Sequence, residues 1–246
     1  MTRRRWIADT WTATSATLTG DQAVLLARVL RAEPGQIFDV VAGGFLHRAE
    51  ITQVSDNDGE DQSVHFILHE ELESDAALPL HLLLAVFKFD HMEWAIEKAT
   101  ELGIARISPI LARRTEKHLA QSALKRSERW RRIALEASKQ SRRTTIPEIA
   151  DPIPLKQALE QETSPNRILL SETEQTLTLT AALQAATSSQ QEADTALAIG
   201  PEGGWTPEEM SLFTQHNWRH VTLGPRILRA ETAAIAAIAI ASTHLS

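Results

Sequence analysis

The pattern of apolar and polar positions divides the chain into two parts that differ in the secondary structure they predict. Up to about residue 75, short runs rich in β-branched or alternating apolar residues are separated by turn residues, which predicts strands. The run IFDVVAGGFLHRAEITQV (37–54) predicts a β-hairpin that turns at Gly43-Gly44, and VHFILHEEL (64–72) predicts a further strand. Residues 21–31 have the spacing of a short amphipathic helix. This first part is expected to be a small β-rich domain.

After Pro79 the pattern changes to strands that alternate with helices. LHLLLAVFKF (80–89) is nearly continuous in apolar residues, as in a strand buried on both faces. Further strands are predicted at IARISPIL, RILLSE, TALAIG and HVTLG, and a helix over 92–102 is expected to end at Gly103. This alternation predicts a mostly parallel α/β sheet. The expected domains are 1–75 and 76–246.

Composition narrows the class of protein. The chain has 246 residues, of which 43% are apolar and 23% charged, enough for a substantial core. It has no cysteine, which excludes disulfides, thiolate metal sites and cysteine nucleophiles and fits a reducing compartment. The longest apolar run, Ala233–Ala241, is less than half of the roughly 20 residues that a membrane-spanning helix needs. Because the N-terminus has no apolar signal segment either, a cytoplasmic protein without a membrane partner is expected.

The net charge of −7 conceals one basic segment. Residues 113–143 carry eleven Lys or Arg against three Glu, a net +8, so the rest of the chain has a net charge of −15. A helix over 121–140 is predicted there, with an apolar stripe that includes Trp130 and a separate charged face. The segment is either a solvated helix face or a site for a polyanion, whose affinity would then depend on salt.

The first candidate for chemistry is IGPEGGWTPEEM (199–210), which follows a predicted strand. Its glycines allow the backbone to approach a ligand closely. Residues 206–209, Thr-Pro-Glu-Glu, predict a helix start with a capping box. The segment lacks the P-loop and dinucleotide-binding patterns, and a tight strand-to-helix turn is the alternative interpretation.

The second candidate is LGPRILRAET (223–232), at the end of another predicted strand. The alanine-rich sequence after it predicts a buried helix. That interpretation does not account for three charged residues, Arg226, Arg229 and Glu231, that follow closely after the predicted strand. Burying these charges without a ligand or partner would be energetically costly.

Together these strings resemble the RsmE family of 16S rRNA uracil-N3 methyltransferases, in the SPOUT superfamily. The segments KFDHMEWAIEKATELGIARISPI and RWRRIALEASKQSRRTTIPEI extend the resemblance, which covers nearly the whole chain. It implies a SPOUT-type parallel sheet with a C-terminal trefoil knot, preceded by a PUA-like β-barrel RNA-binding domain. It also implies a homodimer that acts on 16S rRNA within the small ribosomal subunit. The chain departs from the family pattern at Arg142 and at its basic N-terminal RRRW.

The resemblance also implies the ligand and the residues around it. The methyl donor S-adenosylmethionine is expected at three loops, with Trp205 beside them. The donor-binding residues are expected to be Leu170, Ser171, Glu172, Ile199, Gly200, Pro201, Gly203, Gly204, Leu223, Gly224, Ile227 and Leu228. No metal is expected, because a sulfonium already activates the methyl group.

The acceptor atom requires a further group, because N3 of neutral uracil carries a hydrogen. Arg226 or Arg229 is expected to favour the uracil anion, and Glu202 is a candidate base that ranks below the arginines. RNA phosphates are expected to contact arginines of the basic segment and the first domain: Arg5, Arg28, Arg31, Arg113, Arg114, Arg129, Arg132, Arg142 and Arg143. Two alternatives stay open, an RNA-binding assembly factor with the same fold and a methyltransferase with another RNA target.

Overall fold

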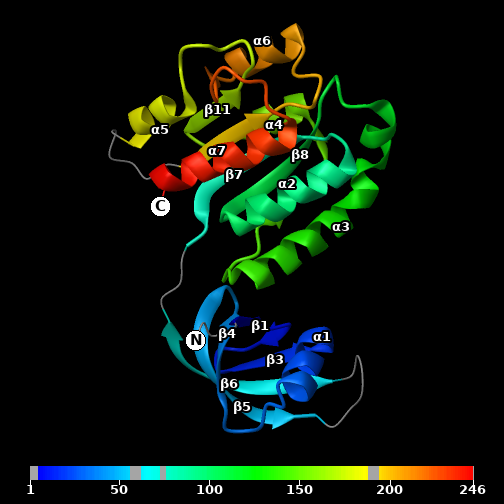
Figure 1. Cartoon of the computed structure of the whole chain (residues 1–246), viewed down its shortest axis with the longest axis vertical. Coiled ribbons are helices and arrows are strands. Elements are labelled where there is room, and N and C mark those ends of the chain that lie inside the picture. Colours follow the sequence, from blue (N-terminus) through cyan, green and yellow to red (C-terminus); the bar gives the residue numbers. More distant parts are fainter. Residues whose placement is uncertain (1–4, 56–61, 73–75, 188–193, 246) are drawn as a thin grey trace. The chain divides into compact units, whose positions relative to one another are not determined.

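The computed structural model describes residues 5–55, 62–72, 76–187 and 194–245, and it forms two compact units (Figure 1). Unit 1 comprises the chain up to Ala76 together with Ser138–Ile146, and unit 2 comprises Ala77–Ala137 and the chain from Pro147 onward. The expected boundary after residue 75 lies next to residues 73–75, which are outside the described residues. The pattern along the chain did not predict that 138–146 would join unit 1.

Unit 1 is built on one six-stranded sheet with the order β1-β4-β5-β6-β3-β2. β1 pairs in parallel with β4, and every other described pair is antiparallel. The strands are β1 (Arg5–Ile7), β2 (Thr10–Trp11), β3 (Ser15–Thr19), β4 (Ile37–Ala42), β5 (Phe45–Val54) and β6 (Ser63–Leu72). The predicted β-rich first part is confirmed.

Two local predictions in unit 1, a hairpin and a short helix, are confirmed, although part of the helix is π-helical. β4 and β5 make the predicted hairpin, and Gly43 and Gly44 have φ values of 62° and 90°, as a two-residue turn requires. The predicted helix consists of a short α1 (Gly20–Val24) that continues as a π-helical turn, η1 (Leu25–Val29). The apolar spacing that we used to predict a helix does not distinguish α from π geometry over so short a segment.

Unit 2 contains a parallel sheet with the order β10-β8-β7-β12-β11-β13, and a short β9 also pairs with β8. All of these pairs are parallel, which confirms the predicted sheet. The strands are β7 (Leu78–Ala85), β8 (Ile104–Leu111), β9 (Glu148–Ile149), β10 (Ile153–Pro154), β11 (Asn166–Leu170), β12 (Thr195–Ile199) and β13 (Arg219–Val221).

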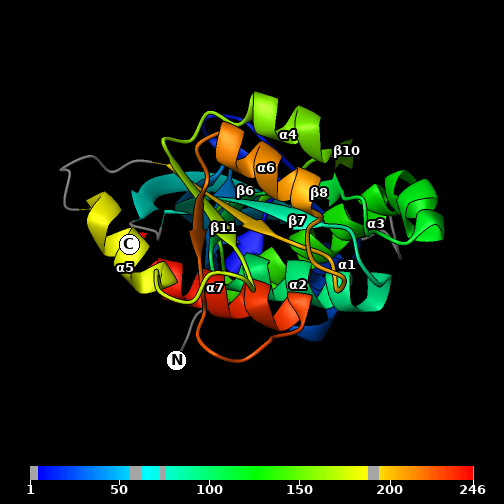
Figure 2. The ribbon, with the colours of Figure 1, turned by 90° about the horizontal axis from the view of Figure 1, so that it is seen from above.

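Helices cover both faces of the unit 2 sheet (Figure 2). They are α2 (Phe89–Glu101), α3 (Lys117–Ser141), α4 (Leu155–Gln161), α5 (Leu179–Thr187), α6 (Pro207–Gln215) and α7 (Ala230–Leu245). Side chains of α2, α3, α5 and α7 share a core with Leu82 and Leu84, whereas α4 and α6 share one with Leu83 and Ala85. Alternate residues of β7 thus enter two cores, which explains its continuous apolar run.

The long helices follow their predicted patterns. On α3, Trp130 and Ala134 are fully buried, and Trp130 packs edge-on against Phe89 of α2 with ring centroids 6.0 Å apart. α2 is followed by Gly103 at a φ of 96°, a left-handed conformation that suits glycine after a helix. Among the described helices, none has the length and apolar character to cross a bilayer.

A buried polar network connects β7, β8 and the end of α4. Nδ1 of His81 lies 2.6 Å from a carboxylate oxygen of Glu162, and Nε2 of the same ring lies 2.8 Å from the hydroxyl of Ser108. The other Glu162 oxygen accepts a hydrogen bond from the backbone N–H of Ser164 at 2.8 Å. Burial opposes ionisation of Glu162, but the bonds from His81 and Ser164 outweigh it and lower its pKa to about 2.

This network predicts a loss of stability in acid. A pKa of about 2 in place of 4.5 corresponds to about 3 kcal/mol of stabilisation by the ionised form. Because the folded-state pKa is lowered, this stabilisation is complete above about pH 4.5 and disappears as the pH falls toward 2. We expect Glu162→Gln to lower the free energy of unfolding by about 2–3 kcal/mol at pH 7 and to flatten its pH dependence below pH 5, measured by urea denaturation.

The exposed Glu160 of α4 provides a matched control, because its pair with Lys156 at 3.8 Å lies on the surface. Glu160→Gln should change the unfolding free energy by less than about 0.5 kcal/mol. Equal effects of the two variants would contradict a special contribution of Glu162.

Candidate functional site

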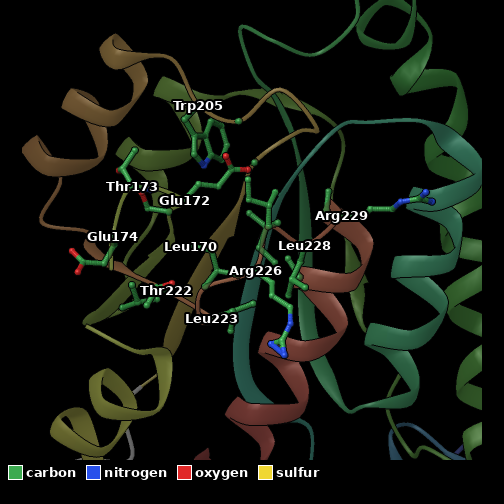
Figure 3. A pocket seen from close by; sticks show the side chains of 18 of the residues that line it. Leu170, Glu172, Thr173, Glu174, Trp205, Thr222, Leu223, Arg226, Leu228 and Arg229 are labelled. Carbon is green, nitrogen blue, oxygen red and sulfur yellow. The ribbon is translucent and has the colours of Figure 1, made fainter. Parts of the chain in front are cut away.

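A cavity of about 990 Å³ lies where β11, β12 and β13 end (Figure 3). Three loops provide most of its wall: 170–175 after β11, 199–205 after β12 and 221–230 after β13. These strands are neighbours and parallel, so their carboxyl ends meet at one edge of the sheet. Ligands of open α/β sheets bind at this kind of edge.

The three loops bring together residues that are far apart in the sequence. Every residue predicted to bind the methyl donor or to act in catalysis lines this cavity, and their individual roles stay predictions. Of the arginines predicted to bind RNA, Arg114 also lines it. The sequence analysis did not assign Thr173, Glu174, Gln175, Thr178, Met210 and Thr222 to the wall, although they contribute to it as well.

The loop after β12 depends on its glycines for its conformation. Gly204 has a φ of 68°, and its N–H donates to the carbonyl of Pro201 at 2.8 Å. A Cβ at Gly200 would lie 3.1 Å from Nε1 of Trp205, whose indole is buried and packs edge-on against Phe213 with centroids 4.9 Å apart. Any larger residue at position 200 would therefore require the buried indole to shift by a few tenths of an ångström.

The predicted capping box at the start of α6 is confirmed, and it also contacts a distant segment. The Thr206 hydroxyl accepts from the N–H of Glu209 at 3.3 Å, and the Glu209 carboxylate accepts from the N–H of Thr206 at 2.8 Å. The second oxygen of this buried carboxylate accepts from the N–H of Arg113 at 2.8 Å. Glu209 therefore fixes the loop after β12 to the loop between β8 and α3.

Arg114 makes a second contact between these two loops. Its Nη1 donates to the carbonyl of Gly203 at 2.6 Å, and a Cβ at Gly203 would lie 3.3 Å from Cδ of Arg114. On the same loop, the carboxylate of Glu202 accepts a long hydrogen bond, 3.5 Å, from the N–H of Lys88. The side chain expected to contact an RNA phosphate thus lies against the glycine loop.

The loop after β11 holds a carboxylate in its ionised form. Glu174 accepts from the hydroxyl and the N–H of Thr176, at 2.7 and 2.8 Å, and from the N–H of Leu177 at 3.0 Å. The hydrogen bond from the Thr176 hydroxyl is the main reason why the pKa of Glu174 falls to about 2. This turn is a local pattern of Glu and Thr without apolar periodicity, which is why the sequence analysis did not single it out.

The loop after β13 is joined to the loop after β11 through the backbone. Thr178 and Thr222 form an isolated parallel bridge, in which Thr222 N–H donates to Leu177 at 2.8 Å and Leu179 N–H donates to Thr222 at 3.1 Å. The Thr222 hydroxyl accepts from the N–H of Gly224 at 3.1 Å, and Gly224 has a φ of 114°. No local pattern predicts this bridge, because its partners are 44 positions apart.

The charged residues at positions 226–231, after β13 and at the start of α7, have different surroundings. In Figure 3 the side chains of Arg226 and Arg229 leave the loop in different directions, and both are exposed. Ile227 lines the cavity and is 81% exposed, so it lies at the cavity rim. Glu231 lies outside the cavity wall and is buried, with one oxygen 3.2 Å from Nδ1 of His91.

The arginines predicted to bind RNA are divided between the two units. Unit 1 contains Arg5, Arg28, Arg31, Arg142 and Arg143, and unit 2 contains Arg113, Arg114, Arg129 and Arg132.

Some of these guanidinium groups already have partners. Arg129 is bound by both oxygens of Glu93, at 2.6 and 2.8 Å. Arg5 donates to the carbonyl of Arg142 at 2.5 Å. Burial lowers the pKa of Arg143 to about 10, which still leaves it charged at neutral pH. To bind a phosphate, Arg129 would have to give up its bonds to the Glu93 carboxylate. We therefore expect Arg129 to contribute less to RNA affinity than the exposed Arg132.

The chemistry of the cavity suits an organic ligand. Its wall combines apolar side chains such as Leu170 and Leu228 with backbone groups of glycine-rich loops, and it is large enough for a nucleoside-sized molecule. Among the described residues, no group of three or more His, Asp or Glu could hold a metal ion.

Several known proteins are similar to this chain in sequence. A family model described as an RNA methyltransferase domain matches residues 74–242. A protein of Synechocystis named ribosomal RNA small subunit methyltransferase E is 35% identical over 92% of this chain and 72% of its own length. The protein of the same name from Bacillus subtilis is 31% identical over 94% of this chain and 90% of its own length.

Two solved structures are similar over nearly the whole chain. A methyltransferase from Legionella pneumophila with bound S-adenosylmethionine has a TM-score of 0.78 and 27% identity, covering 99% of this chain and 98% of its own. A ribosomal RNA small subunit methyltransferase E from Neisseria gonorrhoeae, also bound to S-adenosylmethionine, has a TM-score of 0.76 and 28% identity, covering 98% and 97%.

The contacts of Arg113 and Arg114 predict different effects for two adjacent arginines. Arg114→Ala removes the bond to Gly203 and should lower the affinity for S-adenosylmethionine about fivefold, because an exposed charged hydrogen bond contributes about 1 kcal/mol. Arg113→Ala keeps the backbone N–H that binds Glu209 and should leave this affinity unchanged. Isothermal titration calorimetry measures both. If Arg114 acts only on RNA phosphates, the donor affinity will be the same in both variants, and only RNA binding will weaken.

Proposed function

We propose that this chain, which belongs to the ribosomal RNA small subunit methyltransferase E family, transfers a methyl group from S-adenosylmethionine to N3 of one uridine in 16S ribosomal RNA. The chain is an S-adenosylmethionine-dependent methyltransferase of small-subunit ribosomal RNA. The choice of N3 of a uridine rests on the resemblance of GPEGG and LGPRILRAET to the uracil-N3 enzymes.

One observation carries the assignment of the site. Residues from three separate sequence segments, each expected at the donor, line a single cavity at the ends of adjacent parallel strands. Backbone groups of Gly200–Gly204 and Leu223–Gly224 are suited to the polar edge of an adenine, and Leu170 and Leu228 to its faces. When bound, S-adenosylmethionine supplies an electrophilic methyl group on a positively charged sulfur.

The residues of this chain then have to prepare the uracil. N3 becomes nucleophilic only after it loses its hydrogen, and the negative charge spreads to the two neighbouring carbonyl oxygens. An arginine of the last loop, Arg226 or Arg229, stabilises that charge, and Glu202 is the candidate proton acceptor. Because the two arginines point in different directions, we infer that only one of them faces the uracil (Figure 3).

The finer features of the fold belong to the same proposal. We infer that unit 1 is a PUA-like RNA-binding domain and that the last part of unit 2 is a trefoil knot. Both inferences rest on the resemblance of the chain to the uracil-N3 methyltransferases. We also propose a homodimer that works in the cytoplasm on the small ribosomal subunit, with Arg28, Arg31, Arg132 and the other predicted arginines on the RNA.

The activity itself can be mapped on RNA. The protein is incubated with labelled S-adenosylmethionine and either free 16S rRNA or small subunits from cells that lack the modification. Methylation at N3 removes a Watson–Crick donor, so reverse transcription should stop at one uridine. Donor binding without label in any RNA would favour an assembly factor. Label in another RNA, or no stop at a uridine, would contradict the proposed target.

The roles of the two arginines can be separated by mutation. We expect the alanine variant of the arginine that faces the uracil, with Arg229 tested first, to retain donor binding and to lose about 10²–10³-fold in kcat. The pH profile should also change, because the uracil anion would then form only at higher pH. Arg106 of β8, whose side chain pairs with Glu148 outside the cavity wall, is the control, and Arg106→Ala should have unchanged kcat. Undiminished transfer in both Arg226→Ala and Arg229→Ala would remove the arginines from the mechanism.

A further inference from the structure

Unit 1 has a small hollow on its surface, separate from the donor cavity. The hollow has a volume of about 360 Å³ and is lined by Trp11, Gly43, Phe45, His47 and Leu68, among others. It lies at the turn of the β4–β5 hairpin and beside the β2–β3 hairpin. All of these residues belong to unit 1, so the hollow is complete without unit 2.

Two aromatic side chains of this hollow are unusual in their exposure. Trp11 is 55% exposed and Phe45 is 56% exposed. In contrast, the core of the same unit contains packed aromatic rings. Phe38 contacts Trp6 and Phe66 edge-on, with ring centroids 6.4 and 6.5 Å apart, respectively. Two half-exposed aromatic rings at one hollow indicate a binding surface.

The position of Trp11 is determined by the turn beneath it. A Cβ at Gly43 would lie 2.9 Å from Nε1 of the indole, closer than real Cβ contacts allow, and Gly43 has a φ of 62°. Glycine at this position thus serves two purposes: it makes the hairpin turn and lets the indole lie flat against it. The ring thus lies directly against the turn of the β4–β5 hairpin.

The hollow also offers a polar atom. Nδ1 of His47 is buried and has no hydrogen-bond partner within the described part of the chain. A buried polar atom of this kind is uncommon, and a small movement of the ring would allow it to bond to a ligand in the hollow. A flat ligand with polar edges fits these surroundings better than a purely apolar one.

Positive charge lies next to this hollow within the same unit. A Cβ at Gly44 would contact Thr145 at 3.9 Å, and the Thr145 hydroxyl accepts from the guanidinium of Arg143 at 3.4 Å. In the same segment, the carbonyl of Arg142 binds the guanidinium of Arg5. The guanidinium of Arg143 therefore lies close to the hairpin turn, and that of Arg5 bonds to the same segment, which complements a polyanion that carries flat polar rings.

We propose that the hollow between Trp11 and Phe45 binds an unpaired base of the RNA substrate by stacking, while Arg5, Arg142 and Arg143 attract the adjoining phosphates. This inference rests on the proposed function, since it takes RNA as the substrate. It adds a base-binding subsite in unit 1, which contributes to RNA affinity and not to methyl transfer itself.

The test compares two exposed tryptophans of similar accessibility. Trp94 of α2, in unit 2, is 48% exposed and is the matched control for Trp11. Trp11→Ala, Trp11→Phe and Trp94→Ala are titrated with a fluorescent 16S rRNA transcript at several salt concentrations. Calorimetry with S-adenosylmethionine and thermal unfolding check the donor site and the fold.

We expect Trp11→Ala to bind the transcript about tenfold more weakly, the effect of losing one base stack. The slope of log K against log salt should stay unchanged, since stacking releases no counterions. Trp11→Phe should recover most of the affinity, and Trp94→Ala should behave like the original protein. In turnover, Trp11→Ala should raise KM for RNA and leave kcat and donor affinity unchanged.

Three results would overturn the proposal. They are unchanged RNA affinity in Trp11→Ala, an equal loss in Trp94→Ala, and a loss in Trp11→Phe as large as in Trp11→Ala. A hollow that instead binds a second copy of the chain would be revealed by a change of oligomeric state in Trp11→Ala with unchanged RNA affinity. Failure of the proposed function would be distinguishable from these results, because the protein without substitutions would then bind the donor but would not methylate rRNA.

Discussion

The adjacency of three parallel strands is the constraint on which the site depends. β12, β11 and β13 lie side by side and run in the same direction, so the loops after them emerge at the same edge of the sheet. The apolar side chains of β11 and β12 maintain that order, because helices bury them from both faces, and Val221 of β13 enters one of the same cores. The position of the cavity therefore follows from the strand order of the sheet. The loops after these strands need only adopt conformations that leave the cavity open.

Those conformations depend on a small number of close contacts. The glycine loop after β12 is held from one side by the buried indole of Trp205 and from the other by the loop between β8 and α3. Glu209 is central to this arrangement, since one carboxylate closes the helix cap of α6 and also binds the N–H of Arg113. A rigid donor loop suits a reaction in which alignment of the methyl group with its acceptor provides much of the catalysis.

Under the proposed function, the two units contribute different kinds of chemistry to one substrate. Unit 2 contains the cavity, whose charged residues would stabilise the charge on a single base. Unit 1 presents arginines and exposed aromatic rings, which are the groups that recognise single-stranded RNA without chemical change. The net charge of −7 is compatible with this division, because many of the cationic groups are concentrated in one segment of the sequence, residues 113–143.

The sequence by itself determined many of the elements and the residue types that their loops carry. Apolar periodicity predicted the parallel sheet, α2, α3 and the β4–β5 hairpin, and Thr206 to Glu209 predicted the cap of α6, because these patterns depend on near neighbours in the chain. Only the tertiary structure decided which loops meet and what each arginine contacts. The Thr178–Thr222 bridge, the bond of Arg114 to Gly203 and the pairing of Arg129 with Glu93 join residues dozens of positions apart. Contacts at such separations depend on strand order and packing, which local patterns do not encode.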